Sequence, residues 1–171
     1  MLTTRRLVLR RFRPADGAAL LAYRSDPEVA RYQSWAASAD AAAALAEGDP
    51  DAPGWFQYAI ERTAGHTLIG DVGVNTHENL MQAEIGFTLA RAAQGQGHAS
   101  EAVTAVLDHL FTVRGLHKVS AECDARNTAS ARLLARLGFT REGLRRQHTW
   151  FKGEWTDDLL YGLLAPEWIS R

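Results

Sequence analysis

The feature that most limits how this chain can fold is the stretch QGQGHASEA at residues 94–102. Gly95 and Gly97 lie between an alternating apolar pattern and a run with helical spacing, so they mark the entrance of a helix. The first N–H groups of a helix lack intrahelical partners, and the helix dipole places partial positive charge there. Glycines leave that backbone accessible and permit positive φ angles. The stretch is therefore either a structural turn or a site for a phosphate group.

Strand and helix patterns alternate on both sides of this loop. Strand patterns occur at residues 7–12, 55–62, 67–75, 83–90 and 118–124, and twice within 145–164 around a turn at Lys152-Gly153. Helical patterns begin at Pro14, Asp26, His98 and Asn127, and the alanine-rich segment 36–46 also favours a helix. The helix after the loop has an apolar stripe formed by Ala102, Val103, Val106, Leu107, Leu110 and Phe111. This order predicts an α/β fold in which helices cover both faces of a mixed sheet.

Composition narrows the class of protein. With 171 residues, 46% of them hydrophobic, the chain suits a single domain over residues 1–171. The formal charge of −1 argues against an extended nucleic-acid surface. No apolar stretch approaches the roughly 20 residues that cross a bilayer, and the N-terminus lacks a signal-peptide pattern, so we expect no membrane partner and a cytoplasmic location. A homodimer remains open.

Two families of phosphate-binding loop can be compared with this one. The Walker pattern is absent, because no Lys-Ser/Thr pair follows the glycines. The dinucleotide fingerprint is closer, since Gly95, Gly97 and Ser100 follow G-x-G-x-x-G with the last glycine replaced. That fingerprint normally belongs to repeated parallel βαβ units, whereas here the loop follows a β-meander. A protein that binds a nicotinamide dinucleotide is therefore a secondary alternative.

The loop resembles that of the GCN5-related N-acetyltransferases, the GNAT superfamily. Gln94, Gly97 and Ala99 are in register with the family motif Q/R-x-x-G-x-G/A. Further family features follow in the right order: the strand AEIGFTLA, the N-x-x-S motif at 127–130, L-G-F at 137–139 and E-G at 142–143. The opening TTRRLVLRRFRPAD and the tail GEWTDDLLYGLLAPEW resemble the RimJ/RimL-like branch of ribosomal-protein alanine N-acetyltransferases. The resemblance covers nearly the whole chain.

The resemblance implies a GNAT-like fold, with a mixed, mostly antiparallel sheet and helices on both faces. It implies acetyl-CoA as the donor and direct transfer of its acetyl group to a primary amine, either a protein N-terminal α-amine or that of a small molecule. The strands on either side of the helix at His98 would splay apart to admit the acyl chain, and a strand N–H would polarise the thioester. The residues implied to bind the donor are Phe87, Thr88, Leu89, Gln94, Gly95, Gln96, Gly97, His98, Ala99, Ser100 and Asn127.

Acetyl transfer also needs a group that takes a proton from the amine. Glu84 is the candidate, because it alternates away from Ile85 and Phe87 and matches a glutamate of the branch. The alternative is that Glu84 is a solvated strand carboxylate. Glu122 on the next strand is then the reserve.

The group that protonates the leaving thiolate is less defined. Many relatives carry a tyrosine in the second helix, but Leu134 stands at that position here. Ser130 is the nearest candidate acid, or the thiolate leaves unaided, which its pKa near 8.5 permits. Ser130 is also an ordinary first-turn residue, and Asn127 is a good helix N-cap whether or not it contacts the donor.

Four residues lie in segments that flank the acceptor in this branch, namely Tyr32, Trp35, His148 and Trp150. They are candidate substrate-binding residues, although strand aromatics commonly serve in packing. The identity of the amine, and an acyl group longer than acetyl, remain open. A non-catalytic acyl-CoA-binding module is the alternative from another functional class. Cys123 is interpreted as a core residue, and the scattered histidines predict no metal site.

Overall fold

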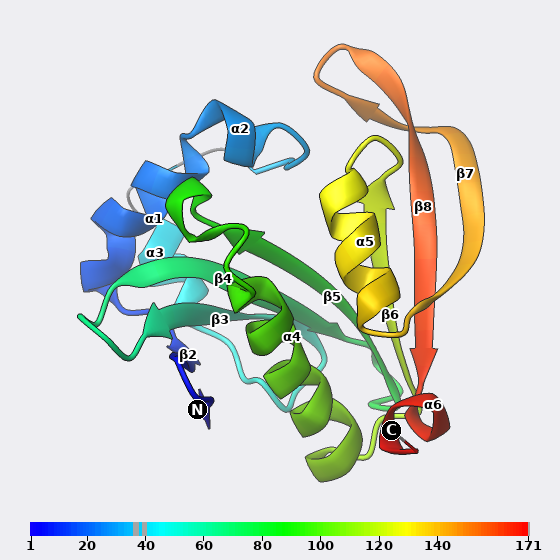
Figure 1. Ribbon diagram of the computed structural model, residues 1–171, viewed down its shortest axis with the longest axis horizontal. Helices are drawn as coiled ribbons and strands as arrows, with labels where there is room; N and C mark the ends of the chain where they lie inside the picture. The colour runs from blue at the N-terminus through cyan, green and yellow to red at the C-terminus, as the bar shows by residue number, and fades with distance from the viewer. Residues whose placement is uncertain (36–37, 39–40, 171) are drawn as a thin grey trace.

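The structure is a computed structural model that describes residues 1–35, 38 and 41–170. Its centre is an eight-stranded sheet in the spatial order β1-β2-β3-β4-β5-β6-β8-β7 (Figure 1). The strands are β1 (Leu2–Thr3), β2 (Leu7–Arg11), β3 (Gly54–Arg62), β4 (Leu68–Thr76), β5 (Gln82–Leu89), β6 (Lys118–Asp124), β7 (Thr140–Phe151) and β8 (Glu154–Leu164). Six of the seven strand pairs are antiparallel, and β5 and β6 run parallel. The mixed, mostly antiparallel sheet is confirmed.

Helices cover both faces of this sheet. They are α1 (Gly17–Arg24), α2 (Pro27–Ala30), α3 (Ala41–Leu45), α4 (His98–Asp108), α5 (Thr128–Arg136) and α6 (Ala165–Ile169). Short 3-10 turns lie at Pro14–Asp16 and Arg91–Ala93. Of the alanine-rich segment 36–46, residues 36–37 and 39–40 lie outside the described residues, and α3 is the described helical part.

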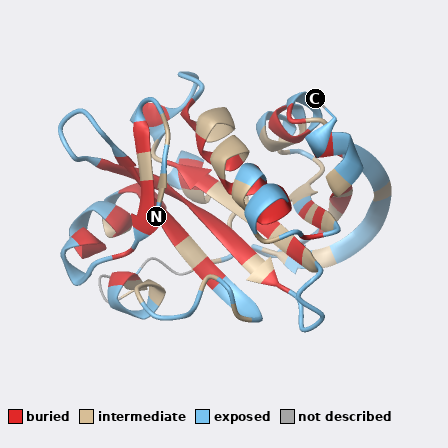
Figure 2. Cartoon of the chain, turned by 90° about the horizontal axis from the view of Figure 1, so that it is seen from below, coloured by how far each residue is buried: buried red, intermediate tan, exposed pale blue. Residues whose placement is uncertain are grey.

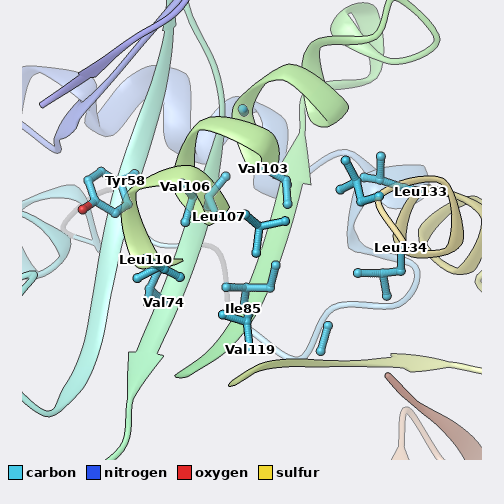
Figure 3. Packing of buried hydrophobic residues seen from close by; sticks show 14 of the residues in the cluster. Tyr58, Val74, Ile85, Val103, Val106, Leu107, Leu110, Val119, Leu133 and Leu134 are labelled. Carbon is cyan, nitrogen blue, oxygen red and sulfur yellow. The ribbon is translucent and has the colours of Figure 1, made fainter. Parts of the chain in front are cut away.

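The main core lies between the sheet and helices α4 and α5. Val103, Leu107 and Leu110 of α4 pack over Ile85 of β5 and Val119 of β6, as Figure 3 shows. Leu133 and Leu134 of α5 extend the same cluster. The predicted apolar stripe after the glycine loop is therefore buried as expected. Most residues of the central strands are buried, whereas β7 is largely exposed (Figure 2).

A second, smaller cluster packs α1 to α3 against the opposite face of the sheet. It contains Leu20 and Tyr23 of α1, Val29 of α2, Ala42 of α3 and Ala59 of β3, with further apolar residues around them. Beneath α1, the fully buried carboxylate of Asp71 accepts hydrogen bonds from Tyr23 and Gln57. These contacts attach the helical layer to β4, next to the strand that carries Thr88.

Three features differ from the sequence expectation. The helix that starts at His98 finishes in an unexpected π-helical turn at His109–Val113, with Arg114 as C-cap and Gly115, at a φ angle of 69°, directly after it. Strand β7 begins at Thr140, before the expected segment 145–164, because it pairs with β8 along nearly its whole length. Helix α6 was not expected, although Pro166 in its first turn is a typical start signal. Its Trp168 indole donates to Asp108 at 2.9 Å and so ties α6 to the end of α4.

Gly70 allows β4 and β5 to approach closely at the position where β5 forms the wall of the site. A Cβ at Gly70 would lie 2.1 Å from the carbonyl oxygen of Thr88. We expect Gly70→Ala to lower the free energy of unfolding by about 1–3 kcal/mol, because the two strands must separate. Gly86→Ala is the matched control, since no atom lies within 4 Å of its added Cβ. Urea unfolding measures both variants, and equal stabilities would contradict this account.

Candidate active site

Both glycines of the loop adopt a backbone conformation that other residues rarely adopt. Gly95 has a φ angle of 72°, and Gly97, the N-cap of α4, has a φ angle of 80°. No atom lies within 4 Å of a Cβ built on Gly95, so its surroundings are open. The two glycines of QGQG thus allow the positive φ angles through which the chain enters α4.

The N-terminus of α4 presents unpaired backbone donors. No side chain caps this helix, and its backbone bonding begins with the Glu101 N–H, which donates to the Gly97 oxygen at 3.1 Å. The N–H groups of His98, Ala99 and Ser100 precede that bond and lack intrahelical acceptors. These N–H groups carry no net charge, but with the helix dipole they create a positive potential that suits a phosphate group. We call the N–H groups of His98, Ala99 and Ser100 the phosphate cradle.

Residues of the turn between β1 and β2 support this cradle. The Arg6 guanidinium pairs with the Glu101 carboxylate at 2.6 Å and donates to the Gln96 oxygen at 3.0 Å. Thr4 also donates to Glu101, at 2.6 Å. These contacts lower the pKa of Glu101 and keep its carboxylate charged. The loop is therefore fixed on the side away from the cleft.

Side chains of the loop shape its backbone. The Gln94 amide donates to the Leu89 oxygen at 3.0 Å, and the Gln96 amide donates to the Ala92 oxygen at 2.7 Å. The buried His98 ring lies 3.2 Å from the Ala93 oxygen through Nδ1. The side chains of these three residues, all predicted to bind the donor, are thus engaged with backbone oxygens of the protein itself. Their backbone groups remain available to a ligand.

Strands β5 and β6 separate beside this loop. Their parallel pairing covers Gln82–Ile85 and Lys118–Ala121 and then stops, although β5 continues to Leu89 and β6 to Asp124. The splay that the GNAT resemblance implied is therefore present. Each strand stays paired on its outer side, β5 with β4 as far as Leu89 and β6 with β8 as far as Asp124.

The register shows which β5 groups face the gap. The Ala90 N–H donates to the Ile69 oxygen of β4 at 2.8 Å, and pairing continues with Leu89 opposite Gly70 and Thr88 opposite Asp71. Hydrogen-bonded pairs alternate along an antiparallel ladder, so the Thr88 N–H points toward β4. The N–H groups of Phe87 and Leu89 point into the gap. Of the three backbone N–H groups that were candidates to polarise the thioester, only those of Phe87 and Leu89 therefore have a suitable direction.

A cleft of about 740 Å³ connects the gap with the entrance of α4. Its lining includes twelve of the predicted site residues: Tyr32, Phe87, Thr88, Leu89, Gln94, Gly95, Gly97, His98, Ala99, Ser100, Asn127 and Ser130. Gln96, Glu84, Trp35, His148 and Trp150 were also predicted but do not line it. The glycine loop and the start of α5 thus form opposite walls of one cavity.

Leu134 of α5, which stands where many relatives carry a tyrosine, does not line the cleft. That side chain is buried in the core and lies away from the cleft, so it takes no part in acid chemistry. Asn127 is the N-cap of α5 and accepts from the Ser130 N–H at 3.1 Å. The bond leaves the Asn127 amide NH₂ and the Ser130 hydroxyl at the cleft wall. The capping role expected for Asn127 is confirmed.

Glu84 lies on the face of the sheet opposite α4. It sits across from Ser120 in β6 and is half-buried, with Glu122 two residues further along that strand. Burial and the Glu122 carboxylate raise the pKa of Glu84 above its usual value. Arg145 of β7 pairs with Glu122 at 2.9 Å and lies 3.4 Å from His148, so Glu84, Glu122 and His148 belong to one polar group.

The aromatic residues predicted on the acceptor side have different surroundings. The Tyr32 hydroxyl donates to the Arg126 oxygen at 3.3 Å and bridges the segment after α2 to the β6–α5 loop. Trp35 is half-buried beneath the Arg24 guanidinium, 4.3 Å above its ring. Trp150 stacks edge-to-face on Trp155 at 5.3 Å, and both are exposed near the tip of the β7–β8 hairpin.

Cys123 has the properties of a packed residue. It contacts the main core, and burial followed by the charges of Asp124, Asp158 and Glu122 raises its pKa to about 11. Such a thiol stays protonated near neutral pH and is a poor nucleophile. Among the described residues, no group of three or more His, Cys, Asp or Glu side chains is placed to hold a metal ion. None of the described helices has the length and apolar character to cross a membrane.

Several residues that line the cleft were not predicted from the sequence. Glu28, Val29, Arg31 and Gln33 come from α2 and the segment after it, and Ala129, Leu133 and Arg136 come from α5. A signal existed for α5, because Ser130, Leu133 and Arg136 follow each other at three-residue spacing on one helix face. No comparable pattern identified the residues around α2.

The topology also decides between the two loop families. The dinucleotide alternative needs repeated parallel βαβ units, whereas the described sheet contains a single parallel pair, β5 with β6. A family model described as "Acetyltransferase (GNAT) domain" matches residues 6–140. The chain is 35% identical to the N-acetyltransferase p20 of Bacillus licheniformis, named as uncharacterized, over 99% of this chain and 98% of that protein.

Two further relatives agree with this match. The [Ribosomal protein uS5]-alanine N-acetyltransferase of Escherichia coli is 30% identical over 57% of this chain and 53% of its own length. A crystal structure of a GNAT-family acetyltransferase from Bacillus anthracis superimposes with a TM-score of 0.87 at 26% identity, covering 97% of this chain and 99% of that one. Fold, loop and full-length similarity agree, and the chain belongs to the GNAT family of N-acetyltransferases.

Proposed function

We propose that this protein transfers the acetyl group of acetyl-CoA directly to a primary amine, with Glu84 as the general base. The observation that carries the proposal is the end of β5–β6 pairing at Ile85 and Ala121, beside the uncapped entrance of α4. The gap suits an extended amide chain that pairs with β5, and the helix entrance suits its pyrophosphate. When bound, acetyl-CoA supplies an activated thioester.

The residues of the two walls have separate tasks. The N–H groups of His98, Ala99 and Ser100 bind the pyrophosphate. The N–H of Phe87 or Leu89 donates to the thioester carbonyl, and such a preorganised donor typically contributes about 3 kcal/mol to lowering the barrier. Asn127 donates from its amide to the pantetheine arm. Ser130, whose backbone N–H is bound to Asn127, is the proposed hydroxyl donor to the departing sulfur.

Glu84 receives the proton of the acceptor amine, directly or through a water molecule. Its position outside the cleft lining is compatible with this role, because it lies on the opposite face of the sheet from α4 while the strand gap opens to both faces. The raised pKa makes the carboxylate a stronger base than an exposed glutamate. Glu122 stays the reserve, although its bond to Arg145 occupies one of its oxygens.

The acceptor is proposed to be the N-terminal α-amine of a protein, with small amines as the second candidate. The support is the Escherichia coli relative named for ribosomal-protein alanine acetylation, together with the RimJ/RimL-like ends of this chain. Tyr32 and the residues after α2 form the acceptor end of the cleft in this proposal. We further propose a cytoplasmic enzyme in which residues 1–171 form one domain.

The first test concerns the donor site. Acetyl-CoA or CoA should raise the melting temperature, because a ligand at a hundred times its dissociation constant stabilises by about 2.7 kcal/mol. Gly97→Val should abolish this shift, since valine resists a φ angle of 80° and its Cβ would lie 3.4 Å from the Arg6 guanidinium that holds the loop, so the loop must change shape. Differential scanning fluorimetry with CoA and NADH gives the comparison. A folded Gly97→Val protein that retains full affinity would mean that the loop is only a turn.

The second test concerns Glu84. Glu84→Gln keeps the shape but cannot accept a proton, so turnover at neutral pH should fall about 10²- to 10⁴-fold while CoA affinity is unchanged. Because the base acts when ionised and its pKa is raised, the wild-type rate should decline at acidic pH earlier than an exposed glutamate would predict. The variant should lose this limb and regain rate at high pH, where the amine is neutral.

The measurement is a pH–rate profile of both proteins by thiol release, with the best acceptor from a panel of peptides and small amines. Glu122→Gln is the matched control. It removes the nearby charge that raises the pKa of Glu84, so its acidic limb should shift to lower pH. An unchanged rate in Glu84→Gln would remove Glu84 from the mechanism. A joint loss of rate and CoA affinity would assign it a structural role instead.

A further inference from the structure

The face of the sheet opposite α4 carries three rows of residues that run across β3, β4 and β5 toward the strand gap. Residues paired directly across neighbouring strands share a face, so the register gives the members of each row. The rows are Trp55-Asn75-Glu84, Gln57-Gly73-Gly86 and Ala59-Asp71-Thr88. Ile85, which lies between two of these positions along β5, points toward α4 instead (Figure 3). The middle row thus places two adjacent glycines beside the row that contains Glu84.

The two glycines of the middle row have different surroundings. A Cβ built on Gly73 would lie 2.8 Å from Oε1 of Gln57 and 3.2 Å from Cζ3 of Trp55, so the indole extends from its own row over Gly73. A Cβ built on Gly86 would have no atom within 4 Å. Neighbouring strands lie about 4.8 Å apart. The space over Gly86 is therefore open, with the Trp55 ring on one side and the strand gap on the other.

This open space lies next to the groups proposed to react. Glu84 is two residues from Gly86 on the same face, about 6.7 Å along the strand. The N–H of Phe87, which faces the gap, belongs to the next residue, and Thr88 on the same face lines the cleft. An amine that reaches Glu84 and the gap therefore carries its substituent toward Gly86. The Trp55 side chain is 58% exposed, so its ring is accessible to that substituent.

The charges on this face favour an uncharged substituent. Glu84 makes no ion pair with the described residues, and the reacting amine needs its carboxylate. The other carboxylates on this face of the described strands β3 to β6 are paired with arginines, namely Glu61, Asp71, Glu122 and Asp124. A second ammonium group over Gly86 would lack a free carboxylate on these strands, whereas an alkyl group would be buried against the indole.

We propose that the space over Gly86 binds the apolar side chain of the acceptor's first residue, and that Trp55 makes the enzyme prefer α-amines with such a side chain. This inference rests on the proposed acetyl transfer to an α-amine. The indole supplies a rigid apolar wall, and the absence of a side chain at Gly86 lets the acceptor approach the strand. Trp55 and Gly86 thus determine acceptor specificity, whereas Glu84 takes the proton.

The experiment measures kcat/KM by thiol release, with saturating acetyl-CoA and two peptides that differ only in a leucine or a glycine as first residue. The ratio of the two values does not depend on the fraction of enzyme that is active, so a less stable variant still gives a valid result. Burial of a leucine side chain predicts that the wild-type protein prefers the leucine peptide about 10- to 100-fold. Pentylamine and cadaverine, a monoamine and a diamine of equal length, test the exclusion of a second cation.

Two variants change the space in opposite ways. Trp55→Ala removes the wall and should reduce the preference to about 3-fold or less, whereas Trp55→Phe should retain most of it. Gly86→Val fills the space and should lower kcat/KM for the leucine peptide about 10-fold or more, with a smaller effect on the glycine peptide. Gly86 does not have a positive φ angle, so valine suits its strand backbone. Ile169→Ala is the control, because it truncates an exposed apolar side chain of α6 and should keep the wild-type ratio.

The outcomes separate this inference from the proposed function. A wild-type ratio in both Trp55→Ala and Gly86→Val would overturn the inference and leave the proposed function intact. More efficient use of cadaverine than of pentylamine would also overturn it, because the enzyme would then recognise a second cation. A wild-type protein that binds acetyl-CoA but acetylates no amine of the panel would reject the proposed function, and this inference with it.

Discussion

The parallel pairing between β5 and β6 ends halfway along the two strands, and the rest of the site depends on that interruption. The strands separate after Ile85 and Ala121, and their freed backbone edges form the inner walls of a gap. Neither strand frays, because each remains bonded to an outer neighbour along its length. The unsatisfied edge groups that a sheet normally avoids are thereby held in place for a ligand.

Packing of α4 and α5 on one face of the sheet holds the two sides of the gap in place. Helices α4 and α5 share the main core, with Val103 and Leu107 on one side of the gap and Leu133 on the other. The same helices carry the polar groups of the cleft at their ends, where backbone donors or an N-cap are available. Burial of the apolar faces therefore fixes the spacing between the phosphate cradle and Asn127. The apolar faces of these two helices therefore contribute stability, and their N-terminal ends supply the polar groups of the site.

Much of the fold was predictable because, along the central segment, the apolar periodicity of each element agrees with the glycine and asparagine residues at its boundaries. The strand at 83–90, the glycine loop, the helix at His98 and the helix after Asn127 all have strong patterns, and the structure contains each of them. The strand gap was not predictable from composition, since pairing that stops midway leaves no mark on alternation. It came from the family resemblance. The start of β7 was placed too late because its exposed, mostly polar side chains hide the strand pattern.

The candidate site was predictable where function rests on backbone, and less so where it rests on side chains. Positive φ angles could be predicted for Gly95 and Gly97 because glycine adopts them readily. The bond between the exposed Gln96 amide and the Ala92 oxygen has no such sequence signal. Arg136 escaped notice because an exposed arginine at a helix end is common. Its place in the lining of the cleft is evident only from the structure.

The proposed acetyl transfer depends most directly on pairing between the donor and the free edge of β5. Residue-resolved amide hydrogen exchange by NMR tests this with and without acetyl-CoA, in the absence of an acceptor. Protection of the Phe87 and Leu89 amides should increase strongly on binding, because both N–H groups face the gap. The Thr88 amide, which already faces β4, should change little. Unchanged exchange at Phe87 and Leu89 in a saturated complex would contradict the account.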